Sequence, residues 1–147
     1  MGRSGRLLTL TTLALMSACD SDPTGLGDAE RLMTGAFDWL SSSGGIAGRQ
    51  FTPASEGYSV RLEFAGDQVR AFRSGTLVGE ARFTLREDSL RASPQPVYLV
   101  EYEPTLQVFP FDAFEQHTLR IVGKLVVELD DGCCDRYTHT FAKSDVR

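Results

Sequence analysis

Apolar and polar residues alternate along most of this chain, and this alternation constrains the fold more than any other feature. The clearest run is 119–129, where every second residue from Leu119 to Leu129 is apolar or glycine, while Arg120, Lys124 and Glu128 lie between them. Successive side chains of a strand point to opposite faces, so this pattern predicts sheets with one dry and one wet face. Since no sustained helical period is present, we predict an all-β fold.

Turn-forming clusters divide the alternating runs into short segments. We predict about eight strands, at residues 33–42, 46–52, 58–64, 68–73, 76–86, 97–103, 117–129 and 135–142. The longest irregular stretch is then 104–116. Short sequential strands joined by tight turns favour a single antiparallel up-and-down barrel, which leaves no exposed sheet edge. A two-sheet β-sandwich is the alternative.

The first predicted strand carries a family resemblance. The run Gly35-Ala36-Phe37-Asp38-Trp39, followed by the glycine-rich segment 43–48, is similar to the opening of small lipocalin-like bacterial lipoproteins. In lipocalins a Gly-x-Trp motif lies on the first strand, and its tryptophan ring plugs the closed end of the barrel. Here Phe37 occupies that position and Trp39 lies two residues further on. The resemblance implies an eight-stranded calycin-type barrel that holds a small apolar ligand.

The first eighteen residues have the organisation of a secretory signal peptide. Arg3 and Arg6 precede an apolar run, 7–15, and the small residues Ser17 and Ala18 follow it. This pattern is typical of a segment that is removed during export. The apolar run is too short for a transmembrane helix, which needs about 20 residues.

Cys19 directly follows the small residues, and the segment 15–19 resembles the lipobox of bacterial lipoproteins. The resemblance implies that Cys19 becomes the first residue of the mature protein and carries the acyl chains. More than one chain is needed for stable anchoring, and a multiply acylated cysteine meets that requirement. An ordinary secretory cut, with a free thiol at Cys19, is the alternative. We therefore expect a signal peptide over 1–18, a flexible tether over 19–31 and a barrel domain over 32–147.

The charge balance argues against a polyanionic partner. The chain has 15 basic and 20 acidic residues. Without Arg3 and Arg6 the balance is 13 against 20, which leaves a formal charge of −7 for residues 19–147. An acidic domain has no electrostatic attraction for nucleic acid. We therefore expect the membrane, reached through the lipid anchor, and a small apolar ligand or an envelope protein as partners.

Cys133 and Cys134 are adjacent and would lie in an oxidising compartment after export. Neighbouring Cα atoms are about 3.8 Å apart, whereas ordinary disulfides span about 4.4–6.8 Å, so a bridge between them is possible but strained. Two free thiols and a bridge to another chain are the alternatives.

The irregular stretch 104–116 is the preferred place for function because it is unusually apolar for a loop. It contains Phe109 and Phe111, which we expect to cover the barrel mouth, the barrel side or a partner. The inward faces of the predicted strands carry Trp39, Tyr58 and His139, which we expect to face a ligand together with these two phenylalanines. An interior void lined by Trp39, Tyr58 and His139 would favour ligand binding. A filled interior with Phe109 and Phe111 exposed would favour a protein partner.

The sequence contains no catalytic motif and predicts no cofactor. There is no Gly-x-Ser-x-Gly elbow, no His-Glu-x-x-His helix and no phosphate-binding glycine loop. His117 and His139 are the only histidines, and no second histidine falls at metal-ligand spacing from His139, so no metal site is predicted. We therefore expect a non-enzymatic binding module in the bacterial cell envelope, with a structural or protein-interaction module as the alternative.

Overall fold

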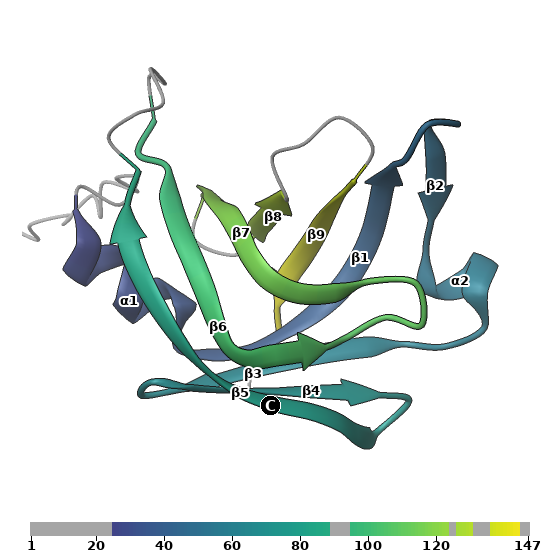
Figure 1. Ribbon diagram of the computed structural model, residues 1–147, viewed down its shortest axis with the longest axis horizontal. Helices are drawn as coiled ribbons and strands as arrows, with labels where there is room; N and C mark the ends of the chain where they lie inside the picture. The colour runs from purple at the N-terminus through teal and green to yellow at the C-terminus, as the bar shows by residue number, and fades with distance from the viewer. Residues whose placement is uncertain (1–24, 89–94, 124–125, 131–135, 145–147) are drawn as a thin grey trace, which may run out of the picture.

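The computed structural model describes residues 25–88, 95–123, 126–130 and 136–144, and these form a closed antiparallel β-barrel (Figure 1). The strands are β1 (Gly35–Gly44), β2 (Arg49–Phe51), β3 (Val60–Ala65), β4 (Gln68–Arg73), β5 (Thr76–Glu87), β6 (Tyr98–Gln107), β7 (Ala113–Val122), β8 (Val126–Asp130) and β9 (Tyr137–Lys143). Two helices accompany them, α1 (Leu26–Met33) and α2 (Pro53–Glu56). The prediction of an all-β up-and-down barrel is confirmed.

The barrel closes through β1, which pairs with β3 on one side and with β9 on the other. In the described part of the chain, β1 and β3 to β9 make up the eight-stranded ring, and each pairs antiparallel with the next. The short β2 pairs only with the end of β1, from Ser42 to Gly44, and adds a flap outside the ring. Every ring strand therefore has two neighbours, so no ring edge stays open.

The sequence predicted eight ring strands, but two of its assignments were wrong. The segment 46–52 is not a ring strand, because β2 has only three residues and pairs beyond the rim. The segment 117–129 is not one strand, because the chain turns at Gly123, where φ is +68°, and continues as β8. The apolar alternation continues on both sides of that turn, which hides it in the sequence. These two errors cancel in the strand count.

The predicted irregular stretch 104–116 was also mostly wrong. β6 continues past Pro104 to Gln107, and β7 begins at Ala113, so only residues 108–112 form a loop. The pairing register between β6 and β7 shifts between Glu101 and Leu106. This irregularity accommodates Pro104, which has no N–H to donate to a ladder. We call residues 108–112 the mouth loop.

The two ends of the barrel are covered by different elements. Helix α1 covers the end where β1 begins, with the side chains of Ala29 and Met33 fully buried. Tyr98 Oη donates to the carbonyl oxygen of Gly25 there, at 3.4 Å. Residues 26–31 of the expected tether thus lie in this helix. The opposite end, at the right in Figure 1, contains the mouth loop, β2 and α2, and we call it the mouth.

The barrel interior is a continuous core of apolar and aromatic side chains. Phe37, which the sequence resemblance placed where lipocalins have their tryptophan, is buried towards the α1 end and packs edge-on against Phe64, with ring centroids 5.9 Å apart. Within the described residues, no helix combines the length and the apolar character needed to cross a membrane.

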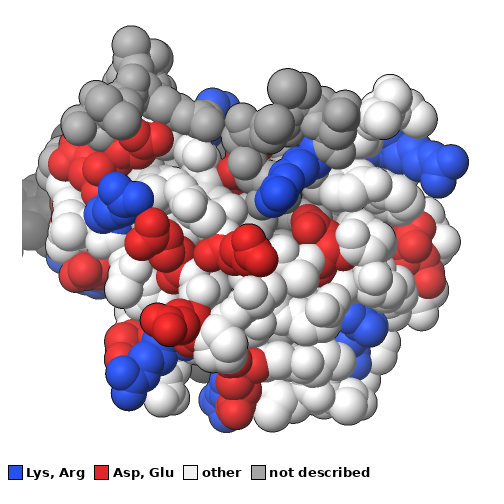
Figure 2. Space-filling model, viewed as in Figure 1, with Lys and Arg blue, Asp and Glu red and all other residues white. Residues whose placement is uncertain are grey.

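On the wet outer face, charged side chains form ion pairs between neighbouring strands. Asp38 and Arg61 are directly opposed on β1 and β3 and form a two-point ion pair, with N–O distances of 2.7 and 3.2 Å. The Arg61 guanidinium lowers the pKa of Asp38, against the opposing effect of partial burial. On the face shown in Figure 2, basic and acidic groups are interspersed. Such a mixture of charges is typical of a solvated surface.

Candidate functional site at the barrel mouth

The five residues predicted to face a ligand lie together at the mouth. Tyr58 stacks on Trp39 with ring centroids 5.8 Å apart, and Trp39 contacts Phe109 at 5.0 Å. The Phe109 ring then stacks on His139 at 4.7 Å and on Phe111 at 5.2 Å. Residues from β1, β9, the segment before β3 and the mouth loop thus form one continuous series of ring contacts.

Phe109 acts as a plug. Its side chain is fully buried, and its ring fills the space between Trp39 and His139. Phe111 lies further out, 38% exposed, and packs on Phe51 and Tyr137. The interior is filled, as the hypothesis of a protein partner required, and Phe111 is partly exposed, but Phe109 is buried rather than exposed. The criteria of neither sequence hypothesis are therefore met in full. Phe109 is supplied by the mouth loop, whereas most of the core below it comes from the barrel strands.

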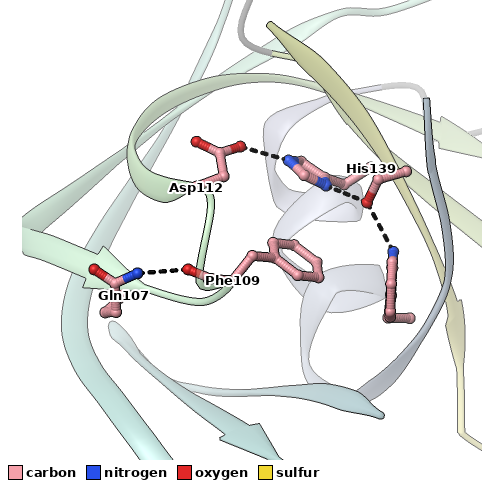
Figure 3. A network of polar contacts seen from close by, with 6 residues as sticks. Gln107, Phe109, Asp112 and His139 are labelled. Carbon is pink, nitrogen blue, oxygen red and sulfur yellow. Dashed lines mark hydrogen bonds and ion pairs between the residues drawn. The ribbon is translucent and has the colours of Figure 1, made fainter. Parts of the chain in front are cut away.

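A line of buried polar groups passes beside the plug (Figure 3). Trp39 Nε1 donates to Ser42 Oγ at 2.9 Å, Ser42 Oγ lies 2.6 Å from His139 Nδ1, and His139 Nε2 lies 2.7 Å from Asp112 Oδ2. A neutral imidazole with its proton on Nε2 satisfies all three contacts, because Ser42 then donates to Nδ1 and Nε2 donates to the carboxylate. This line connects the barrel wall to the mouth loop.

A β-bulge places Ser42 in this line. Strict alternation after Phe37 and Trp39 would turn Ser41 inward, but the β1–β9 register shifts between Trp39 and Ser41. The bulge reverses the parity, so Ser42 is fully buried while Leu40 is 47% exposed. Sequence reasoning missed Ser42 for this reason, since nothing in the run of three serines marks the inward one.

Sequence reasoning also missed His117 and Asp112. His117 lies on β7 and His139 on β9, with β8 between these two strands. Their rings are nevertheless 6.1 Å apart inside the barrel, and both side chains are buried. Asp112 is the last residue of the mouth loop, with a side chain 15% exposed. The closed ring brings these three residues together although their spacing along the chain gives no signal.

The mouth also contains two buried donor atoms. Among the described residues, neither Tyr58 Oη nor Arg73 Nε has a hydrogen-bond partner. The Arg73 guanidinium lies over the Tyr58 ring, 5.6 Å from its centroid. Burial raises the pKa of Tyr58, the charge of Glu56 adds to this effect, and Arg73 opposes it. The phenol therefore remains protonated at neutral pH and can donate.

Replacing Ser42 by alanine tests the buried line. We expect Ser42→Ala to lower the free energy of unfolding by about 1–3 kcal/mol, because it leaves Trp39 Nε1 and His139 Nδ1 buried without their hydroxyl partner. Urea denaturation followed by circular dichroism measures the loss. Ser43→Ala is the matched control, since Ser43 is exposed on the same strand. Equal stability of the two variants would show that the hydroxyl does not bridge these rings.

Three predicted site residues lie outside the described residues, namely the lipid attachment at Cys19 and the two cysteines of the expected bridge, Cys133 and Cys134. Comparisons of the chain with models of protein families, with curated proteins and with solved structures find no match. The interpretation of the site therefore depends on its own geometry.

Proposed function

We propose that this chain is a non-enzymatic binding module, tethered to the bacterial cell envelope by a lipid on Cys19. It binds a small, mainly apolar ligand in the barrel mouth, in the space that the Phe109 ring fills when the mouth loop is closed. The observation that supports this proposal most is that a five-residue loop, rather than a strand, supplies the side chain at the centre of the mouth.

The mouth loop is held by few polar contacts, which makes its opening feasible. Arg73 Nη2 donates to the carbonyl oxygen of Val108 at 2.7 Å, and Gln107 Nε2 donates to that of Phe109 at 2.6 Å. Among the described residues, a third side-chain contact joins Asp112 to His139. All three can be exchanged for water or ligand without breaking any strand pairing. Loop opening would expose Trp39, Tyr58 and His139, which are the residues that the sequence indicated.

Tyr58 and Arg73 define the polar part of the ligand. Both buried atoms, Tyr58 Oη and Arg73 Nε, are donors, so a complementary ligand carries a hydrogen-bond acceptor such as a carboxylate. The aromatic rings around them suit an apolar body. A medium-chain fatty acid has both properties and is a suitable probe.

The tether would give the barrel a definite orientation. The described chain enters the domain through α1, at the end opposite the mouth loop. A lipid on Cys19 would then hold the α1 end near the membrane and leave the mouth facing away from it. Detergent phase partitioning tests the anchor: the native chain should enter the detergent phase, whereas a Cys19→Ser variant should remain in the aqueous phase.

Ligand binding can be followed through Trp39, which is the only tryptophan of the chain. We expect N-phenyl-1-naphthylamine to quench Trp39 by energy transfer, and decanoate to displace it. Tyr58→Phe should weaken decanoate binding about tenfold, the effect of one lost hydrogen bond to a charged group, and leave the uncharged probe unaffected. Tyr137→Phe makes the same chemical change next to Phe51 and Phe111, away from Tyr58, and is the control. Absence of quenching at saturating probe would contradict the proposal.

A further inference from the structure

We propose that Asp112, His117 and His139 bind one divalent transition-metal ion of the zinc class. The proposal is independent of the apolar ligand and of the lipid anchor, because it depends only on these three side chains. Each offers one ligand atom, and the three atoms lie within 4.8 Å of one another. The ligands come from the mouth loop, β7 and β9, so the metal would join the loop to the barrel wall.

As a group, the three ligand atoms must move slightly closer together to coordinate one metal ion. A tetrahedral zinc site has metal–ligand distances of about 2.0–2.1 Å, which places its ligand atoms about 3.3 Å apart. His139 Nε2 and Asp112 Oδ2, now at 2.7 Å, would separate slightly to admit the ion. The widest pair would approach by roughly 1.5 Å. Asp112 lies at the end of a loop and can move by part of this distance, and rotation of the His117 side chain supplies the rest of the movement.

The donor set determines the class of metal. Two imidazoles and one carboxylate suit Zn²⁺, Co²⁺, Ni²⁺ and Cu²⁺, whereas Ca²⁺ and Mg²⁺ require oxygen ligands. The surroundings also favour a bound cation. His139 is fully buried and His117 is 1% exposed, and Phe109 and Phe114 pack against these rings. Exclusion of water strengthens the attraction between the ion and the Asp112 carboxylate.

Ser42 supplies the support that metal-binding histidines require. Such a histidine holds its second ring nitrogen by a hydrogen bond, which fixes the orientation of the ring. Ser42 Oγ lies 2.6 Å from His139 Nδ1 and is itself held by Trp39 Nε1. With the metal on Nε2, the proton of the neutral ring lies on Nδ1 and is donated to Ser42 Oγ, since a hydroxyl can accept as well as donate. No change in net charge of the ring is required.

Zinc titration of the purified, tag-free protein tests the proposal. The cysteines are alkylated first, so that thiolates do not compete for the ion. We expect one Zn²⁺ per chain by isothermal titration calorimetry, and Co²⁺ should give the visible absorption of a site with nitrogen and oxygen ligands. Saturation with zinc should raise the melting temperature by about 5 °C or more, because the ion binds only the folded chain.

Variants identify the ligands. His117→Gln and Asp112→Asn should each weaken zinc binding at least tenfold, while the new amide oxygen of the second variant can still accept the hydrogen bond from His139. Glu115→Gln is the control, because it makes a carboxylate-to-amide change on the exposed side of β7. Failure of the parent to bind zinc, or equally tight binding by the folded Asp112→Asn variant, would overturn the proposal. If His117→Gln does not fold, Asp112→Asn decides alone, because its change lies on a loop.

Discussion

Phe109→Ala is expected to lower the free energy of unfolding by about 3–4 kcal/mol, because the variant removes a fully buried ring from the centre of the mouth. The ring contacts Trp39, His139 and Phe114, so its loss leaves a cavity that the surrounding strands cannot close. Urea denaturation followed by circular dichroism gives the stability, and the emission of Trp39 should shift to the red as water reaches the indole.

Phe111→Ala is the matched control in the same loop. Its side chain is 38% exposed, so its removal should cost about 1 kcal/mol. The two variants should also differ in binding. Removal of the plug should tighten the binding of N-phenyl-1-naphthylamine, because the closed loop no longer competes with the probe. If Phe109→Ala cost no more than Phe111→Ala, Phe109 would not be the plug.

Gly44→Ala is expected to destabilise the barrel by about 3 kcal/mol or more. Gly44 has φ of +143°, and a Cβ there would lie 2.2 Å from the carbonyl oxygen of Arg136. That same oxygen accepts a hydrogen bond from the N–H of Gly45. Since Gly44 pairs with Tyr137 at the β1–β9 seam, the clash can be relieved only by moving the backbone that closes the ring. Thermal unfolding measures the effect.

Gly48→Ala separates the steric effect from the backbone conformation. Gly48 also has a positive φ, +57°, but nothing lies within 4 Å of its added Cβ. We expect a cost of about 1 kcal/mol, which is the cost of the left-handed conformation alone. If Gly44→Ala and Gly48→Ala lowered the stability by similar amounts, the β1–β9 seam would tolerate a side chain and would not close as described.

The alternation of the sequence predicted the barrel because a period of two is a local property of strands. The strand boundaries were harder to predict. The chain turns at Gly123 in the middle of an apolar run, with no polar cluster to mark the turn. Pro104 lies within β6, although a proline normally indicates the end of a strand. Both errors have the same origin, since pairing with neighbouring strands overrode the local signal.

The candidate site was predicted in part. Aromatic residues on the inward faces, and the apolar loop, indicated Trp39, Tyr58, His139 and Phe109 because burial is readable from residue type. The polar residues Ser42 and His117 of the site could not be predicted from residue type. Ser42 faces inward only because of a bulge, and His117 meets His139 only because the ring closes through β8. Sites assembled across a closed sheet depend on register, which spacing along the chain does not give.

The most direct test of ligand binding at the mouth is the nuclear magnetic resonance signal of the Trp39 indole N–H. One tryptophan gives one such signal, and its hydrogen bond to Ser42 should slow exchange with solvent. Addition of decanoate should shift this signal until binding is saturated, and signals from α1 should not move. The affinity obtained from the shift should equal the affinity measured by displacement of N-phenyl-1-naphthylamine. An unshifted indole signal at saturating decanoate would contradict binding at the mouth.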